Sequence, residues 1–163
     1  MKDKAESESP TENSSTLYTF FNEIGVINQL FSTAFRRALP VGMTSAQFTV
    51  LNHFARLGGE RTPAQLAASF QVTKGAITNT LQKLEEKGYV VIATDPEDRR
   101  RKIVTVTDKG LSKREETLAA TAPALAQMVE ELDLSEIKAA LPFLQQVRIY
   151  LDKARDEIDF SDL

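Results

Sequence analysis

Apolar side chains recur with a helical period over most of this chain. From Leu17 to Leu39 they return every three or four residues, which predicts a long amphipathic helix that ends near Pro40 and Gly42. Residues 1–16 are rich in Ser, Glu, Lys, Pro and Thr and show no such period. A segment of that composition buries too little apolar surface to fold, so we expect a disordered N-terminal tail there.

Two Thr-x-x-Gln patterns, at residues 44–47 and 62–65, mark the starts of two further helices. In each the threonine hydroxyl can accept from a free backbone N–H while the glutamine reaches back, and Pro63 suits a first helical position. A tight connection at residues 71–72 then leads to a third short helix over residues 73–87, which its first threonine can cap. The order predicts a helix-turn-helix.

Residues 89–94 and 103–107 are β-rich runs on either side of a charged turn, Asp95-Pro96-Glu97-Asp98-Arg99-Arg100-Arg101-Lys102. Asp-Pro favours a turn, because proline fixes φ and the aspartate side chain bonds its own backbone. The valines, isoleucines and threonines on both sides favour strands. We therefore predict a β-hairpin that carries four consecutive cations at its tip.

The C-terminal residues 108–163 predict two more helices, the first capped at Thr107-Asp108 and the second beginning near residues 133–135. Their apolar positions recur close to sevens, as in a coiled-coil seam, which favours dimerisation; packing within one chain is the alternative. Pro123 and Pro142 predict bends or breaks. The expected interface residues are Leu17, Phe20, Leu144, Leu151 and Ile158.

Charge is distributed unevenly although the 163-residue chain has a net charge of only -3. Residues 73–109 are net +2 and residues 110–163 are net -5, so a nucleic-acid contact is favoured in the first of these segments. The chain has one histidine, no cysteine and no glycine-rich phosphate loop, so we expect no enzyme, metal or cofactor. Without an apolar leader or a run of roughly 18 apolar residues, we expect a cytoplasmic protein that avoids membranes.

The predicted helix over residues 73–87 has two unlike faces. Ile77, Leu81 and Leu84 fall on one side at 100° per residue. The opposite side is short and hydrogen-bonding, as a helix that enters the major groove requires, although an ordinary solvated face is the alternative. The candidate DNA-binding residues on this helix are Thr73, Lys74, Gly75, Thr78, Asn79, Gln82 and Lys83.

The candidate DNA-binding residues of the hairpin are Asp98, Arg99, Arg100 and Arg101. Adjacent cations repel one another without an anionic partner, and an arginine suits the negative potential of a narrow minor groove. Alternate strand residues share a face, so we expect Asp98 and Arg100 to lie together, with the aspartate holding the arginine extended. The alternative is a self-contained surface network with Asp95, Glu97 and Asp98.

These segments resemble the MarR family of transcriptional regulators. The resemblance rests on the motifs at residues 72–79, 84–90, 95–100 and 106–110, in the family's order and spacing. It implies a mostly α winged helix-turn-helix fold with a small β-hairpin wing and long terminal dimerisation helices. The DNA-binding lobe would span residues 44–107, and the dimerisation helices residues 17–43 and 108–163.

The resemblance also implies a function. The protein would be a homodimer that binds a pseudo-palindromic site in double-stranded DNA and regulates transcription, for which we favour steric repression over activation. Asp98 and Arg100 match the family's Asp-x-Arg wing motif. Asn79 stands where many members have arginine, and the absence of cysteine argues against the thiol-oxidation branch. The alternative function is a winged-helix module that docks on proteins.

Many family members bind small aromatic or anionic effectors in a cleft between the dimerisation and DNA-binding parts. The residues that could line such a cleft here are Phe20, Phe21, Phe48, His53 and Arg56. The alternatives are that His53 is structural or exposed and that the phenylalanines belong to the core.

Overall fold

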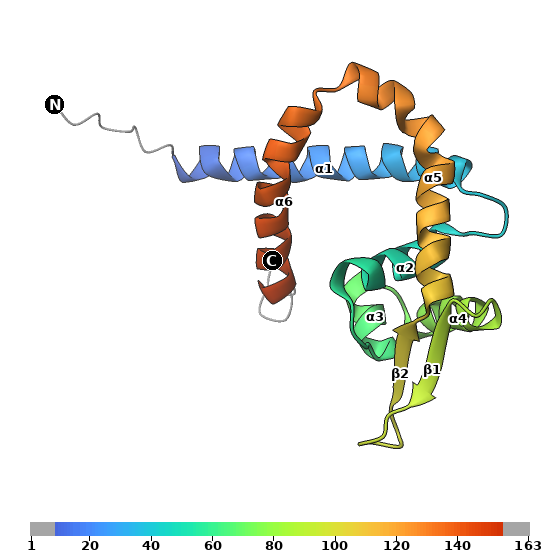
Figure 1. The fold of residues 1–163 in the computed structure, drawn as a ribbon. Coiled ribbons are helices and arrows are strands. Elements are labelled where there is room, and N and C mark those ends of the chain that lie inside the picture. The colour runs from blue at the N-terminus through green and yellow to red at the C-terminus, as the bar shows by residue number, and fades with distance from the viewer. Residues whose placement is uncertain (1–8, 155–163) are drawn as a thin grey trace. The chain divides into compact units, whose positions relative to one another are not determined.

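Six helices and one β-hairpin follow one another in the computed structural model, which describes residues 9–154 (Figure 1). The elements are α1 (Pro10–Ala38), α2 (Ser45–Leu57), α3 (Pro63–Phe70), α4 (Lys74–Glu86), β1 (Val90–Thr94), β2 (Lys102–Val106), α5 (Asp108–Glu131) and α6 (Leu134–Ala154). Two compact units, Met1–Ala124 and Leu125–Leu163, divide the chain. The first therefore holds the predicted helix-turn-helix and hairpin together with α1 and most of α5.

Helix α1 begins at Pro10, so the expected disorder is wrong for residues 10–16. The Ser9 side chain caps this helix by accepting a hydrogen bond from the backbone N–H of Glu12 at 3.3 Å. Ser, Pro and Glu at these spacings form a helix-start signal that outweighs the polar composition of the segment. Residues 1–8 lie outside the described residues.

The helix starts predicted from the capping patterns are confirmed. Thr44 and Gln47 form a reciprocal capping box at α2, and Thr62 and Gln65 form another at α3. Gln71 then takes the left-handed conformation, with φ 51°, that turns the chain from α3 into α4. This single residue sets the tight connection between the two helices of the helix-turn-helix.

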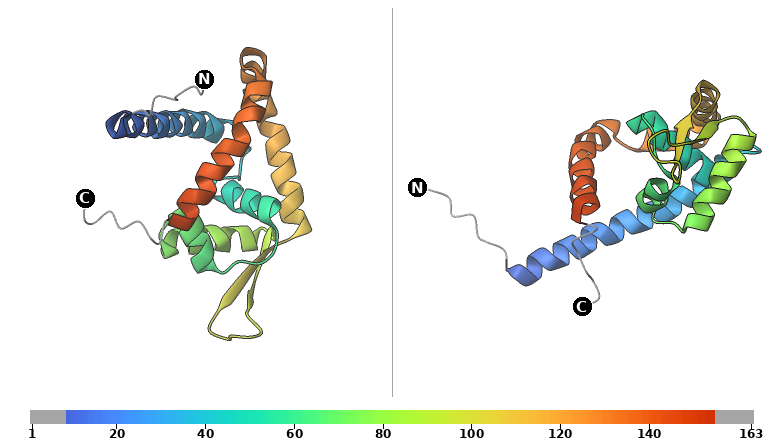
Figure 2. Two further views of the ribbon diagram at one scale, coloured as in Figure 1. Left: turned by 90° about the vertical axis from the view of Figure 1, so that its left-hand side faces the viewer. Right: turned by 90° about the horizontal axis from the view of Figure 1, so that it is seen from below.

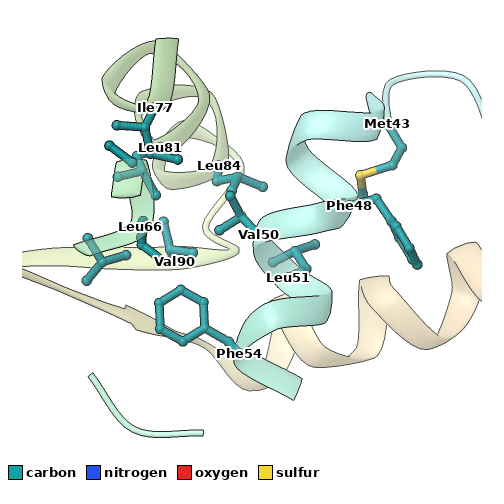
Figure 3. Packing of buried hydrophobic residues seen from close by; sticks show 12 residues of the cluster. Met43, Phe48, Val50, Leu51, Phe54, Leu66, Ile77, Leu81, Leu84 and Val90 are labelled. Carbon is teal, nitrogen blue, oxygen red and sulfur yellow. The ribbon is translucent and has the colours of Figure 1, made fainter. Parts of the chain in front are cut away.

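Buried side chains from α2, α3, α4 and both strands form one hydrophobic core (Figure 3). Leu51, Leu66 and Leu84 are fully buried, and shortening a side chain of this kind to alanine costs about 2–5 kcal/mol. The end of α1 joins this core through Phe35, whose ring lies 5.1 Å from that of Phe48. Leu118 of α5 packs against the same cluster.

The hairpin is antiparallel, with Val90 paired to Val106 and Thr94 to Lys102. It extends away from the helices that carry its base (Figure 2). A backbone bridge from Arg61 to Val104 fixes the outer edge of β2, with N···O distances of 3.1 and 2.8 Å. Short contacts at the base, rather than a larger sheet, therefore orient this hairpin.

The C-terminal helices begin near the predicted positions. Both run through their prolines, Pro123 and Pro142, without interruption, so the alternative of a broken helix is wrong. Leu144 and Leu151 are exposed on α6, as is Leu17 on α1, and Ile158 lies outside the described residues. Within residues 9–154, no helix is sufficiently long and apolar to cross a membrane.

Gly110 marks the closest approach of α5 to the hairpin. A methyl group at this position would lie 2.1 Å from the backbone oxygen of Tyr89 and 3.0 Å from a methyl group of Val106. The same backbone oxygen accepts from the N–H of Thr107, which ties the end of β2 to the start of β1. Any side chain larger than hydrogen would push these segments apart.

We expect Gly110→Ala to lower the free energy of unfolding by at least about 1–3 kcal/mol, because the added methyl overpacks against backbone atoms that cannot move alone. Urea denaturation measures the change. Gly75→Ala is the matched control: a methyl there meets no atom within 4 Å, so the same substitution should leave stability equal or slightly higher. Equal curves for the Gly110 variant and wild type would contradict the close approach.

Candidate nucleic-acid interface

Helix α4 turns its polar face to the surface as the sequence predicted. Ile77, Leu81 and Leu84 are buried in the core. The seven candidate residues of this helix and its cap are all exposed: Thr73, Lys74, Gly75, Thr78, Asn79, Gln82 and Lys83. Thr73 caps the helix by accepting from the N–H of Ala76 at 3.2 Å. The first turn therefore presents its positive dipole end and two basic or small residues to solvent.

The turn of the hairpin is organised by two aspartates that bind backbone. The buried Asp95 side chain accepts from the N–H of Glu97 at 2.9 Å, and Asp98 accepts from the N–H of Arg100 at 2.9 Å. The N–H of Asp95 donates to the carbonyl of Arg101 at 3.0 Å and closes the loop. Hydrogen bonds to backbone N–H groups thus give the turn a defined shape.

The expected pairing of Asp98 with Arg100 on one strand face is wrong. Both residues lie in the turn before β2, where the alternation of strand side chains does not apply. Asp98 contacts the backbone N–H of Arg100 and, within the described part of the chain, makes no ion pair with its guanidinium. The aspartate therefore shapes the loop rather than holding the arginine side chain.

The four cations of the hairpin divide into two kinds. Arg101 lies 3.8 Å from the carboxylate of Asp95, and the ammonium of Lys102 donates to Thr94 at 2.9 Å. Arg99 and Arg100 are exposed and form no ion pair among residues 9–154. A self-contained network thus covers only one of the three arginines, and the other two point their charge at solvent.

A hollow of about 370 Å³ joins α4 to the base of this turn. Its walls come from the start of α3, the first turns of α4, the end of the hairpin turn and the first residue of β2: Thr62, Pro63, Ala64, Lys74, Ile77, Thr78, Arg100, Arg101 and Lys102. Lys74 and Thr78 of the predicted helix candidates therefore meet Arg100 and Arg101 of the hairpin candidates around one concave, cationic surface. The other candidates do not line this hollow: Thr73, Gly75, Asn79, Gln82, Lys83, Asp98 and Arg99. The start of α3 belongs to it too, which the sequence reasoning missed.

Three contacts that tie these elements together carry no local sequence signal. The Arg61–Val104 bridge pairs backbone groups, so the side chain of Arg61 gives no sign of it. Arg114 of α5 donates twice to the side-chain oxygen of Asn52 on α2, at 3.2 and 2.9 Å. Glu85 accepts from the edge N–H of Ile92 at 3.1 Å and ties α4 to β1.

The residues expected to line an effector cleft lie in different surroundings. Phe48 is buried in the core, which confirms the structural alternative for this residue. Phe20 and Phe21 pack edge to face on α1 with centroids 5.2 Å apart, and Arg56 is exposed on α2. An effector cleft involving Phe20, Phe21, His53 and Arg56 stays a prediction.

His53 is half-buried, and its ring is nearly perpendicular to the rings of two phenylalanines. Its ring centroid lies 5.2 Å from that of Phe70 and 6.0 Å from that of Phe54. Its Nε2 atom is buried without a hydrogen-bond partner among the described residues. Burial lowers the pKa of His53 below its usual 6.5, and the positive charges of Arg61 and Arg56 lower it further.

Helix, turn, helix and a cation-tipped hairpin, held on one core, define a winged helix-turn-helix protein. In sequence, the model of the MarR family matches residues 41–101. The "Transcriptional activatory protein BadR" of Rhodopseudomonas palustris is 29% identical over 93 residues, which are 56% of this chain and 53% of that protein. The chain thus spans about half the length of the curated relatives it matches.

Solved structures agree with this class. Wild-type apo MarR from E. coli has a TM-score of 0.65 at 27% identity, over 77% of this chain and 94% of that one. A cysteine-to-serine mutant of the same protein, complexed with operator DNA, has a TM-score of 0.60 at 25% identity, over 81% and 95%. In sequence over residues 41–101 and in fold, the chain is thus similar to the MarR family of winged helix-turn-helix regulators.

The lowered pKa of His53 predicts a pH-dependent stability. Below pH 6.5, His53 of the unfolded chain binds a proton, whereas His53 of the folded protein stays neutral until a lower pH. Its full contribution to the free energy of unfolding is therefore present above pH 6.5 and is lost as the pH falls towards the folded-state pKa. Replacement by phenylalanine removes this titration. Urea midpoints at pH 7.5 and 5.0 should therefore fall less in His53→Phe than in wild type, and equal falls would show that the imidazole is not responsible.

Proposed function

We propose that the protein is a cytoplasmic homodimer that binds a pseudo-palindromic site in duplex DNA and regulates transcription. The observation that carries this proposal is the single surface on which the polar face of α4, the start of α3 and the base of the wing meet. A helix face of this kind and two solvent-directed arginines complement the major groove and the phosphates beside it.

Helix α4 is the element we assign to the major groove. Asn79 and Gln82 are exposed, and neither side-chain amide has a hydrogen-bond partner within residues 9–154. Such amides can bond the N6 and N7 atoms of adenine in a bidentate manner. The first turn of α4 and Lys74 suit a phosphate, because free N–H groups and the helix dipole both attract anions.

The wing is the element we assign to the flanking minor groove. Arg99 and Arg100 have no carboxylate partner among the described residues, and the loop that holds them is fixed by backbone bonds. An arginine that is already free of an ion pair loses no such pair on binding. The negative potential of a narrow A·T-rich groove would favour it there.

The dimer is proposed from exposed apolar stripes on the terminal helices. Leu17, Ile27 and Leu30 of α1 are more than half exposed, and further large apolar side chains are exposed on α6. Soluble monomers rarely leave contiguous apolar stripes in water. In a two-fold dimer, two α4 helices would meet successive major grooves, with half-sites about 10 bp apart.

Steric repression is the mode of regulation that we propose. A winged dimer bound across a promoter excludes polymerase without further chemistry. The relative BadR is named as an activator, so activation is the second candidate. Footprints that overlap promoters would support repression, whereas footprints upstream of them would support activation.

The test of DNA binding is selection from a random-sequence duplex library with the purified protein. The proposal expects a consensus with two inverted half-sites and an affinity that falls steeply with salt. A protein-docking module would enrich no sequence and show little salt dependence. An affinity that falls with salt while no sequence is enriched would indicate phosphate attraction alone. An enriched sequence with little salt dependence would indicate sequence recognition with few phosphate contacts.

Arg100→Ala should weaken binding to the selected duplex by about 1–3 kcal/mol and flatten the salt dependence, because one cation no longer faces the DNA. Fluorescence anisotropy at several salt concentrations measures both effects. Arg37→Ala removes the same charge from the end of α1 and is the control. Unchanged affinity for the Arg100 variant would remove the wing from the mechanism.

The exposed stripes on α1 and α6 predict a dimer at micromolar concentration. Sedimentation velocity should show a species of twice the chain mass, and Leu144→Glu together with Leu151→Glu should shift it towards monomer, because buried unpaired carboxylates are costly. Helical content by circular dichroism checks that the variant stays folded. A wild-type monomer at these concentrations would contradict the two-fold arrangement.

A further inference from the structure

Thr78 differs from the other polar residues of the α4 face in how its hydroxyl is used. Its Oγ1 atom donates to the backbone carbonyl of Lys74, one turn earlier, at 2.7 Å. The β-carbon of threonine carries one hydroxyl and one methyl group. With the hydroxyl hydrogen turned back along the helix, Thr78 is left with its methyl group and the acceptor lone pairs of its oxygen for a partner.

We propose that Thr78 reads a thymine base through its methyl group rather than through its hydroxyl. This inference rests on the proposed function, since it assigns one specificity contact within the DNA-binding face. Thymine is the base that offers an apolar group, its C5-methyl, in the major groove. A hydroxyl hydrogen already donated to Lys74 is not available to the acceptor atoms of guanine or adenine.

The surroundings of Thr78 favour a base over a phosphate as its partner. Thr78 is exposed and lines the hollow between α4 and the wing, where Lys74 and Arg100 supply the positive charge. One turn earlier, a methyl group at Gly75 would meet nothing within 4 Å. The charged side chains beside Thr78 can thus contact the phosphates of the DNA backbone. Open space lies next to Thr78 on the same helix.

The fold itself gains little from this methyl group. An exposed methyl on a polar helix face buries no apolar surface, and threonine favours a helix less than alanine does. Thr80 offers a comparison within the same helix. Its Oγ1 makes the same kind of bond, to the carbonyl of Ala76 at 3.0 Å, but Thr80 is half-buried in the hollow formed with α2 and α3.

The experiment separates the two groups of Thr78 on the duplex that wild-type protein enriches most from a random library. Thr78→Val keeps the methyl group and removes the hydroxyl, whereas Thr78→Ser keeps the hydroxyl and removes the methyl group. Each thymine of the half-site is replaced in turn by deoxyuridine, which lacks only the C5-methyl. Anisotropy titrations give the affinity of each protein for each duplex.

We expect one thymine at which deoxyuridine weakens wild type and Thr78→Val by about fourfold per half-site, the factor for one buried methyl group. Thr78→Ser should be insensitive to that replacement and weaker on the parent duplex. The matched control pair is Thr80→Val and Thr80→Ser, both of which should keep the sensitivity of wild type.

Three results would overturn the assignment. Sensitivity to deoxyuridine that persists in Thr78→Ser would mean that another residue contacts the methyl of thymine. Loss of affinity in Thr78→Val alone would mean that the oxygen accepts a bond from an adenine or cytosine amino group. A selected site without a sensitive thymine would exclude the contact while leaving the proposed function intact, whereas a library with no enriched sequence would remove both.

Discussion

The burial of one face of α4 is the constraint on which the rest of the proposed interface depends. Ile77, Leu81 and Leu84 are sealed in the core, and a helix held by three such side chains has one permitted rotation about its axis. That rotation turns the polar residues outward as a set. Rotation by half a turn would bury Asn79 and Gln82 without partners, which costs several kcal/mol in all.

The wing adds a second constraint, in which carboxylates shape the backbone and leave two of the three arginines without an ion pair among the described residues. Asp95 and Asp98 accept from backbone N–H groups, so their charges lie within the loop rather than against every guanidinium. The loop gains a defined conformation, and Arg99 and Arg100 keep their charge for a partner. If each arginine of the turn were paired with an acid, the turn would contain the same charged residues but would bind anions far more weakly.

Local signals in the sequence predicted most of this fold, and distant contacts escaped it. Capping at Thr44 and Thr62 depends on residues three positions apart, so the sequence displays it directly. The Arg61–Val104 bridge joins residues far apart in the chain through backbone atoms, which no side-chain pattern reveals. The start of α1 differs from the prediction although its cap at Ser9 is local, because the polar composition that follows is typical of disorder and hides the capping signal.

Because the chain has an acidic net charge, the proposed recognition of DNA depends on where its cations lie. At physiological salt, exposed charges act over about 8 Å, so the acidic excess of residues 110–163 is screened from groups beyond that distance. In the proposed interface, attraction to DNA would come from the few cations beside α4, which would limit nonspecific affinity. With so little general attraction, discrimination among sites must depend on uncharged contacts, and the amides and the methyl group exposed on α4 are of that kind.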